Sequence, residues 1–419
     1  MYLRAQVLLL AILLAILAGF NYVVDPYGVY SPDHSYQFNH NKTEFFMKEP
    51  VIKPYRVSDM RPDTVILGAS RAGFGYDENH AYFDDKKVYN FSMAGASMYM
   101  IYRAFQHTLH ESELKHVALD LSMTAFDEHH ALVVRDKKNA GIDVFEELIT
   151  VREDGSKNWL SIFRKLAQIP RFLLSYQATK DSIKTLQHQG SHQGWHLNNK
   201  GGWRGSTLPP GTSQGKRFVT ILHLLTNGYF SHPSSSQSFS IYRENGELSR
   251  SFGYFENLLD DAYKNDIDMT LIFSPSHVFF YEAVDYHELG KMYVEWKRQI
   301  ILINTNIAAQ YRKEAFPVWD FAYYSWLNAE MVPEKSNQTA RMRWHYDPLH
   351  FNRAAGNHVL DQVYLNKEGT GVLLSASNLD AEMSIQAQKK KDYREENKAV
   401  IENVKDIMSR AAARFAKQN

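Results

Sequence analysis

The stretch TVILGAS (64–70) is a short run of β-branched and apolar residues that ends in three small ones. A buried parallel strand has this composition, because both of its faces are covered and its residues need not alternate between apolar and polar. Two further stretches of this kind follow at 87–93 and 116–122, and a segment with helical periodicity lies between them at 97–112. Strands that alternate with helices predict βαβ units and a parallel sheet.

The alternation stops after the third expected strand and returns late in the chain. Residues 128–250 contain helical fragments and loops rich in Gly, Ser, Pro and Asn. They predict a large insertion that covers a site or a partner surface, with a disordered loop as the alternative. Expected strands then follow at 268–277 and 315–322, with a helix between them around 287–311. We therefore expect a membrane anchor at 1–25, an extended lead at 26–62, an α/β domain at 63–365 and a C-terminal amphipathic helix at 366–419.

The first segment of the chain is strongly apolar. VLLLAILLAILAGFNYVV (7–24) contains one strongly polar residue, Asn21, and Arg4 precedes it. Its length is near the minimum for a membrane-spanning helix and exceeds the usual apolar region of a signal peptide. We expect an uncleaved transmembrane anchor; a cleaved signal peptide is the alternative, because ILAG offers small residues for cleavage. The positive charge ahead of the segment predicts a cytoplasmic N-terminal end and an extracytoplasmic domain.

Composition excludes several classes of function. Lys plus Arg and Asp plus Glu both number 47, so no overall field favours nucleic acid as a partner. The chain has no cysteine, which excludes disulfides, thiolate metal sites, a cysteine nucleophile and a lipoprotein anchor. His188, His192 and His196 are spaced by four, but glycines interrupt the helix that would align them. We therefore expect no metal site.

Ser70 and the late stretch DPLH predict a nucleophile and its base. Ser70 ends the first expected strand, and ligands of doubly wound sheets bind beyond the carboxyl ends of the strands. A serine hydroxyl needs an imidazole to take its proton, and the imidazole needs a carboxylate to fix its tautomer. His350 and Asp347 fit these two roles. The alternative is that Ser70 and Asp347 only cap turns and that His350 is an ordinary loop histidine.

Other residues predict contacts around the nucleophile. The backbone N–H groups of Ser70 and Gly95 are candidate donors to an oxyanion, although Gly95 can also serve a turn with positive φ. Arg71 is a candidate for binding a sugar hydroxyl, carboxylate or phosphate, with a structural salt bridge as the alternative. His277 ends the strand LIFSPSH and could contact substrate or be a structural histidine.

Taken together, these stretches resemble the SGNH/GDSL hydrolase superfamily. The resemblance implies a flavodoxin-like α/β/α sandwich and activity on esters and acetylated sugars. By position, Ser70 resembles the nucleophile of the first block, Gly95 the oxyanion glycine of the second, and Asp347 and His350 the last block. Two stretches depart from the pattern: GAS stands where Gly-Asp-Ser is usual, and LDLSMT lacks the third-block Asn, which leaves Ser122 as a substitute donor.

The anchor, the stretch NYVVDPYGVY, GASR and the late D-x-x-H together resemble a membrane-anchored bacterial envelope subgroup. This subgroup includes proteins of teichoic-acid D-alanylation and, more loosely, of alginate O-acetylation. The resemblance implies a serine acyltransferase or esterase without a metal or organic cofactor, which acts on acyl groups, O-acetyl foremost, of an envelope or exported polysaccharide. It also implies a single-pass inner-membrane protein with a periplasmic domain and a membrane-bound O-acyltransferase as partner. The alternatives are a non-catalytic scaffold of a polysaccharide-modification complex and a lipid or small-ester hydrolase.

Overall fold

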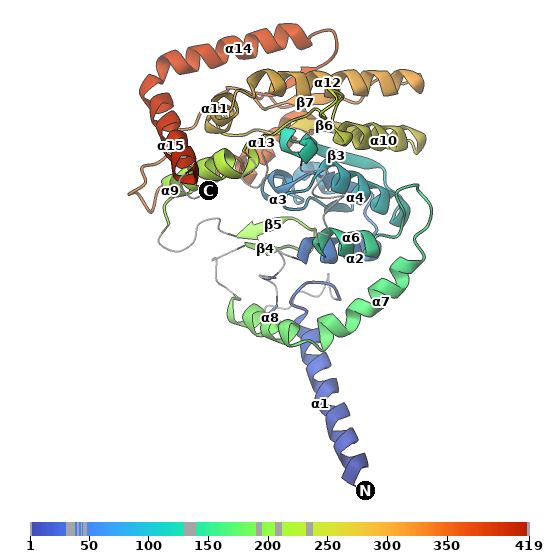
Figure 1. Ribbon diagram of the computed structural model, residues 1–419. Coiled ribbons are helices and arrows are strands. Elements are labelled where there is room, and N and C mark those ends of the chain that lie inside the picture. The colour runs from blue at the N-terminus through green and yellow to red at the C-terminus, as the bar shows by residue number, and fades with distance from the viewer. Residues whose placement is uncertain are drawn as a thin grey trace.

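A mostly parallel sheet forms the centre of the computed structural model (Figure 1). The strand order is β2-β1-β3-β6-β7-β8, and only the pairing of β8 with β7 is antiparallel within this sheet. The strands are β1 (Thr64–Leu67), β2 (Val88–Asn90), β3 (His116–Leu121), β6 (Asp268–Phe273), β7 (Val318–Asp320) and β8 (Val372–Leu374). The predicted α/β class and mostly parallel sheet are confirmed. The structure describes residues 2–30, 38–39, 42, 44, 48–129, 140–189, 195–205, 212–231 and 238–416.

Successive residues of each central strand enter two different cores. Val65 and Leu67 of β1 belong to a large core on one face, whereas Ile66 belongs to a smaller core on the other. In β3, Leu119 belongs to the large core and Ala118 to the smaller one. Both faces of the sheet are therefore covered, which explains why the strands read as continuous apolar runs.

Helices supply the two covers. The large core takes side chains from α2 (Glu49–Met60), α4 (Met98–Glu111), α10 (Arg250–Lys264), α11 (Val278–Tyr286) and α12 (Gly290–Gln310). The smaller core takes them from α3 (Ser70–Gly75) and α13 (Arg353–Leu365). Short 3-10 helices lie at Ala81–Phe83 and Met123–Phe126. The helix expected at 97–112 is α4, and Ser97 caps it by accepting a hydrogen bond from Met100 N at 3.4 Å.

Two expectations about the flanking segments need correction. The lead at 26–62 was expected to be extended, but its later part is α2. Pro50 lies in the first turn of α2, where the backbone N–H that proline lacks would have no partner inside the helix. Pro54 removes a hydrogen bond inside the helix, but burial of Ile52 and Val57 outweighs this cost. The segment 366–419 was expected to be one helix, whereas it contains β8 and then two helices.

These two C-terminal helices are α14 (Leu379–Glu396) and α15 (Lys398–Ala416), which meet at an angle in Figure 1. The predicted apolar stripe of α15 is buried at Val404, Ile407 and Met408. Helix α15 packs on α11 and on α9 (Gln214–Leu224).

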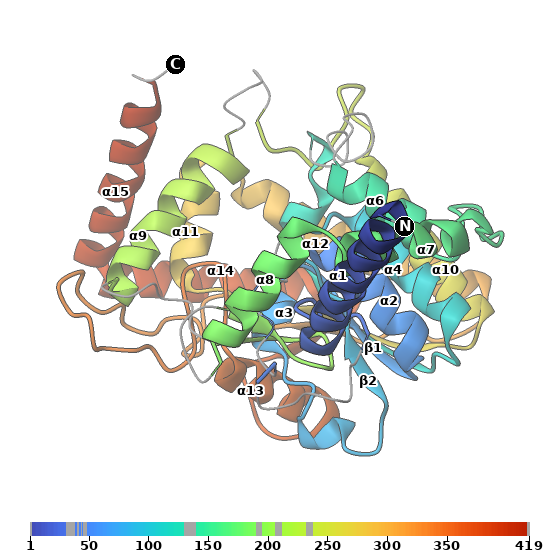
Figure 2. The same ribbon diagram turned by 90° about the horizontal axis from the view of Figure 1, so that it is seen from below.

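The insertion places α7 and α8 at the base of the N-terminal helix, whereas its helix α9 lies beside α15 (Figures 1 and 2). Its elements are α6 (Ala140–Leu148), α7 (Leu160–Leu173), α8 (Tyr176–Gln187), the antiparallel pair β4 (Trp195–Leu197) and β5 (Trp203–Gly205), α9 (Gln214–Leu224) and a π-helical turn (Leu225–Tyr229).

The N-terminal helix α1 (Tyr2–Val24) projects away from the domain (Figure 1). Its 23 residues are long and apolar enough to cross a membrane, judged by length and composition. Its last turn is tied to the rest of the chain. Asn21 Nδ2 donates to Leu173 O at 2.8 Å, and Ser182 Oγ donates to Asn21 Oδ1 at 2.8 Å. The one strongly polar residue of the apolar segment thus joins α1 to the insertion.

Candidate active site

Ser70 lies at the carboxyl edge of the sheet because the chain turns sharply after β1. Gly68 has φ +152°, and a Cβ at this position would lie 2.7 Å from Asp120 Cβ of the neighbouring strand. A glycine is therefore required where the chain passes β3. Ser70 begins α3 directly afterwards and is partly exposed.

The structure brings together the three predicted catalytic residues. Ser70 Oγ lies 2.9 Å from His350 Nε2, across 280 positions of sequence. On the other side of the ring, His350 Nδ1 lies 2.9 Å from Asp347 Oδ1 and 3.0 Å from Oδ2. A carboxylate can only accept, so Nδ1 carries the proton and Nε2 is left to accept the proton of Ser70.

The loop that carries the acid and the base is fixed on several sides. Asp347 Oδ1 also accepts the backbone N–H groups of Leu349 and His350, both at 2.9 Å. Pro348 O accepts the backbone N–H of His277 at 3.1 Å. The ring of Phe74 meets the imidazole edge-on, with 4.8 Å between centroids. These contacts restrict the imidazole to the orientation that faces Ser70.

Arg217 of α9 completes the surroundings of Asp347. Its Nε donates to Asp347 Oδ2 at 3.0 Å, and its Nη2 lies 2.8 Å from the same oxygen. Burial alone would raise the pKa of Asp347, but the charges of His350 and Arg217 and the hydrogen bonds from His350 outweigh it and hold the pKa well below its usual range. Asp347 is therefore ionised at neutral pH. Sequence reasoning missed Arg217, because it lies 130 positions from Asp347 in the insertion and belongs to no motif.

A pocket of about 320 Å³ opens at the nucleophile. Its lining includes Ser70, Gly95, Ser122, Thr124 and Tyr229. Gly95 has φ +64°, the positive φ that was expected for a glycine in a turn. A Cβ at this position would meet no atom within 4 Å. The Ser70 N–H lies in the first turn of α3, where backbone donors have no partner inside the helix. The use of these two N–H groups by an oxyanion stays a prediction.

A buried ion pair holds the loop that contains Gly95. Glu49 and Lys53, one turn apart in α2, lie 3.2 Å from each other. Glu49 Oε2 accepts Ala94 N at 3.0 Å, and Lys53 Nζ donates to Asn90 O at 3.0 Å. Burial raises the pKa of Glu49 and lowers the pKa of Lys53, and each charge opposes the shift of the other.

The same pair reaches into the insertion. Trp203 Nε1 of β5 donates to Glu49 Oε1 at 2.6 Å, and Lys53 Nζ donates to Gly201 O at 2.9 Å. The anchor-proximal helix α2, the insertion and the predicted oxyanion loop therefore form one connected unit.

Arg71 points inward from the pocket wall. Its side chain is buried and donates to Ser274 O at 2.7 Å and to Ser122 Oγ at 3.4 Å. Arg71 also lines the pocket at Ser70, so its contact with a substrate group stays a prediction. Its charge acts on Asp120, the residue before the end of β3. Burial raises the pKa of Asp120 to about 7, against the pull of Arg71.

His277 is structural, which corrects its expected contact with substrate. The imidazole is fully buried and caps α11: Nδ1 accepts Phe279 N at 3.2 Å, and Nε2 lies 2.7 Å from Glu330 O. Burial lowers the pKa of His277 to about 4, so the ring is neutral. Both ring nitrogens are hydrogen-bonded to backbone groups, as is usual for the polar atoms of a buried side chain.

The histidines spaced by four do not share a helix face. His188 follows the end of α8, whereas His196 lies in β4. His192 lies outside the described residues.

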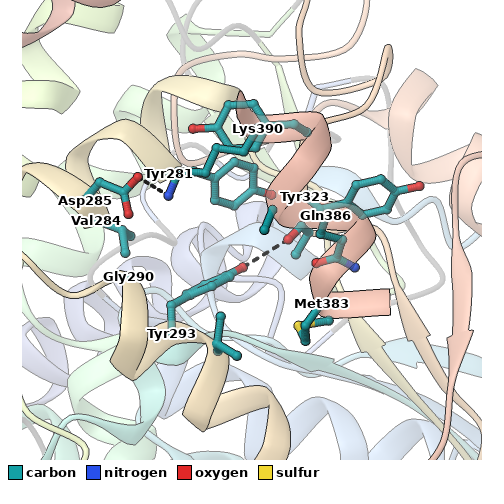
Figure 3. Close-up of a pocket in the computed structure, with 13 residues that line it drawn as sticks. Tyr281, Val284, Asp285, Gly290, Tyr293, Tyr323, Met383, Gln386 and Lys390 are labelled. Carbon is teal, nitrogen blue, oxygen red and sulfur yellow. Dashed lines mark hydrogen bonds and ion pairs between the residues drawn. The ribbon is translucent and has the colours of Figure 1, made fainter. Parts of the chain in front are cut away.

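A second pocket, of about 120 Å³, lies under α14 (Figure 3). Tyrosines from α11, α12 and the segment after β7 line it, and Lys390 of α14 pairs with Asp285 across it. It shares no lining residue with the pocket at Ser70. The pocket at Ser70 therefore adjoins the hydrogen-bonded Ser–His–Asp set, whereas the pocket under α14 does not.

A hydroxyl, an imidazole and an ionised carboxylate in this order can activate the hydroxyl to attack an acyl carbon. No protein-family model matches the chain, and comparison with curated proteins finds no match either.

Proposed function

We propose that this protein is a membrane-anchored serine acyltransferase or esterase of the SGNH type. It acts on acyl groups, acetyl foremost, of a cell-envelope or exported polysaccharide. The observation that carries the proposal is the hydrogen-bonded chain from Ser70 through His350 to Asp347 beside an open pocket. The strand order β2-β1-β3-β6-β7 supports a flavodoxin-like arrangement, in which sites lie at the carboxyl ends of the strands.

The reaction follows from the geometry in two halves. Ser70 Oγ attacks the acyl carbon while its proton passes to His350 Nε2, and the N–H groups of Ser70 and Gly95 stabilise the oxyanion. His350 then gives that proton to the leaving oxygen, and an acyl ester on Ser70 remains. A sugar hydroxyl or water attacks this ester next and gives its proton to His350, which passes that proton to Ser70 Oγ as the acyl–oxygen bond of the ester breaks. Ser122, buried in the pocket wall, is the proposed third donor in place of an asparagine.

The acyl donor and the location complete the proposal. The sequence of α1, with Arg4 ahead of an apolar helix, supports a domain on the extracytoplasmic side of the inner membrane. Activated acyl groups must then reach Ser70 from across the membrane. A membrane-bound O-acyltransferase is the partner that we propose for this step.

The test is covalent capture of the acyl group. The full chain in detergent is incubated with p-nitrophenyl acetate, quenched in acid and measured by intact mass. We expect one acetyl adduct on the wild type and none on Ser70→Ala, because Ser70 Oγ is the hydroxyl that is hydrogen-bonded to His350 Nε2. Thr124→Val is the matched control, since Thr124 lines the same pocket and should leave the adduct in place.

Two results would contradict the proposal. An adduct that survives in Ser70→Ala would place the nucleophile elsewhere. A wild-type protein that stays unmodified by this ester, and also by acyl groups supplied with the partner acyltransferase, would favour a non-catalytic scaffold. Matching thermal unfolding midpoints of the variants would show that both outcomes concern chemistry and not folding.

A further inference from the structure

The helical pair α7–α8 exposes large apolar side chains along one stripe of each helix. Positions 159, 162, 163 and 166, at the start of α7, follow the spacing of one helix face, as in an amphipathic helix, and Phe163 is 67% exposed. In α8 the exposed positions 176, 183 and 186 also share one face, and Tyr176 is 83% exposed. The exposed set on the two helices and on the residues directly before and after α7 is Trp159, Leu160, Ile162, Phe163, Leu166, Leu174, Tyr176, Ile183 and Leu186.

This stripe lies where the membrane anchor leaves the domain. Helix α1 packs on both α7 and α8, and Asn21 Nδ2 bonds Leu173 O of α7 and Thr179 Oγ1 of α8, at 2.8 and 3.0 Å. Figures 1 and 2 show the two helices on either side of the base of α1, crossing its axis instead of continuing it. When α1 spans a bilayer, its last turn lies at the bilayer surface, and so do α7 and α8.

The charge of the segment fits an anionic surface. Residues 157–189 contain one acidic side chain, Asp181, which is buried and bonded to Tyr27 and Lys48. The basic residues of the segment are Lys157, Arg164, Lys165, Arg171, Lys180 and Lys184. The chain as a whole is neutral, so this excess is local. Apolar residues beside Lys and Arg, with Trp and Tyr at the margin, are typical of helices that lie in a bilayer interface.

We propose that α7 and α8 form a membrane-docking surface that inserts its apolar stripe among the headgroups of an anionic bilayer. The domain then has two attachments, the span of α1 and this surface, and sits on the membrane in one orientation. The inference rests on the burial and position of these helices and does not depend on the chemistry at Ser70.

The absence of cysteine from the sequence makes a direct test practical. Phe163→Cys on α7 and Ile183→Cys on α8 each provide one site for an environment-sensitive NBD fluorophore. Leu302→Cys on α12 is the matched control, because Leu302 is also an exposed apolar residue and α12 lies at the end of the molecule opposite α1 (Figure 1). The labelled full-length proteins are reconstituted in liposomes that contain phosphatidylglycerol, with and without nitroxide-labelled lipid.

We expect the nitroxide lipid to quench the probes at 163 and 183 at least about twofold more than the probe at 302, and iodide to quench them less. Replacing phosphatidylglycerol by phosphatidylcholine should weaken the lipid quenching, because the local positive charge loses its partner.

Equal iodide access at all three positions would overturn the proposal by showing that the stripe stays in water. Protection from iodide without quenching by the nitroxide lipid would overturn it in favour of a protein partner or a second copy of this chain. Each substitution replaces an exposed side chain, and a matching thermal midpoint confirms that the labelled chain is folded.

Discussion

Replacing Asp347 by asparagine should inactivate the protein in a way that depends on Arg217. The two carboxylate oxygens of Asp347 face different partners. Oδ1 accepts the backbone N–H groups of Leu349 and His350, Oδ2 faces Arg217, and His350 Nδ1 lies between the two oxygens, at 2.9 and 3.0 Å. An asparagine has one oxygen and one NH₂ group, so it can satisfy only one of these two sides.

Both orientations of the amide are unfavourable. If its oxygen replaces Oδ1, the NH₂ group meets the Arg217 guanidinium, and one charge-assisted bond of about 1.5–3 kcal/mol is lost. If its oxygen faces Arg217, the NH₂ group meets the backbone N–H groups of Leu349 and His350, and these two donors lose their acceptor. Either way the imidazolium loses its counter-charge, and we expect acylation of Ser70 to slow by about 10²–10⁴-fold.

Arg217→Met separates the two contributions. In the wild type it leaves a buried carboxylate with three remaining donors, and we expect a loss of about 1–2 kcal/mol, since Arg217 is 22% exposed and partly screened by water. In the Asp347→Asn background the same change removes the conflict between two donors and should cost nothing or stabilise. The expected coupling energy is therefore about 1–2 kcal/mol.

The assay is a double-mutant cycle on the full chain in detergent. Urea unfolding followed by tryptophan fluorescence gives the stability of the four proteins, and intact mass gives the rate of acetyl-adduct formation. A loss on Arg217→Met that is the same in both backgrounds would refute the assigned contact between Arg217 and the outer oxygen of Asp347.

The remaining predictions concern the turn beneath the nucleophile. The pKa of Asp120 is raised to about 7 from 3.8, so its protonated form stabilises the fold at acid pH, and this contribution is lost as pH rises through about 7. A pKa shift changes the free energy of unfolding by about 1.4 kcal/mol per unit, so the wild type should lose up to about 4 kcal/mol of stability between about pH 4 and 7. Asp120→Asn should abolish this pH dependence. Parallel curves of stability against pH for the variant and the wild type would reject the shift. Gly68→Ala should destabilise by at least about 1–3 kcal/mol and slow acylation, because its φ is +152° and the new Cβ would lie 2.7 Å from Asp120 Cβ. Gly246→Ala is its control, with φ +83° and no atom within 4 Å of the new Cβ, and equal losses in urea midpoint for the two variants would show that the predicted clash at Gly68 is absent.

The sequence predicts the sheet and the three central site residues for a local reason. A strand that is buried on both faces has to be apolar throughout, so the sequence TVIL predicts a buried strand without any knowledge of the segments that pack against it. Ser70 and His350 follow strands of one parallel sheet, and the carboxyl ends of such strands share an edge. Topology therefore brings them together even though 280 positions separate them.

The sequence does not predict the residues that support the site, because their roles are not local. Arg217 and the pair Glu49 and Lys53 acquire their roles only through contacts with segments distant in sequence. An arginine in an amphipathic helix and an i,i+4 ion pair are both ordinary surface features in a sequence. The segment of α2 is polar and aromatic with little periodicity, which led to the prediction of an extended lead. Its helix depends on burial of Ile52 and Val57 in the finished fold.

The long separation between Ser70 and His350 also has a consequence for biosynthesis. The ribosome releases the nucleophile first, then Arg217, and the acid and base last, because the site is assembled from three regions of the chain. Until residue 350 has emerged and the last parallel strand has joined the sheet, Ser70 has no group to take its proton. A nascent chain, or one truncated before residue 350, therefore carries a serine without its base, and no activated hydroxyl is exposed to acyl compounds before that part of the chain has folded.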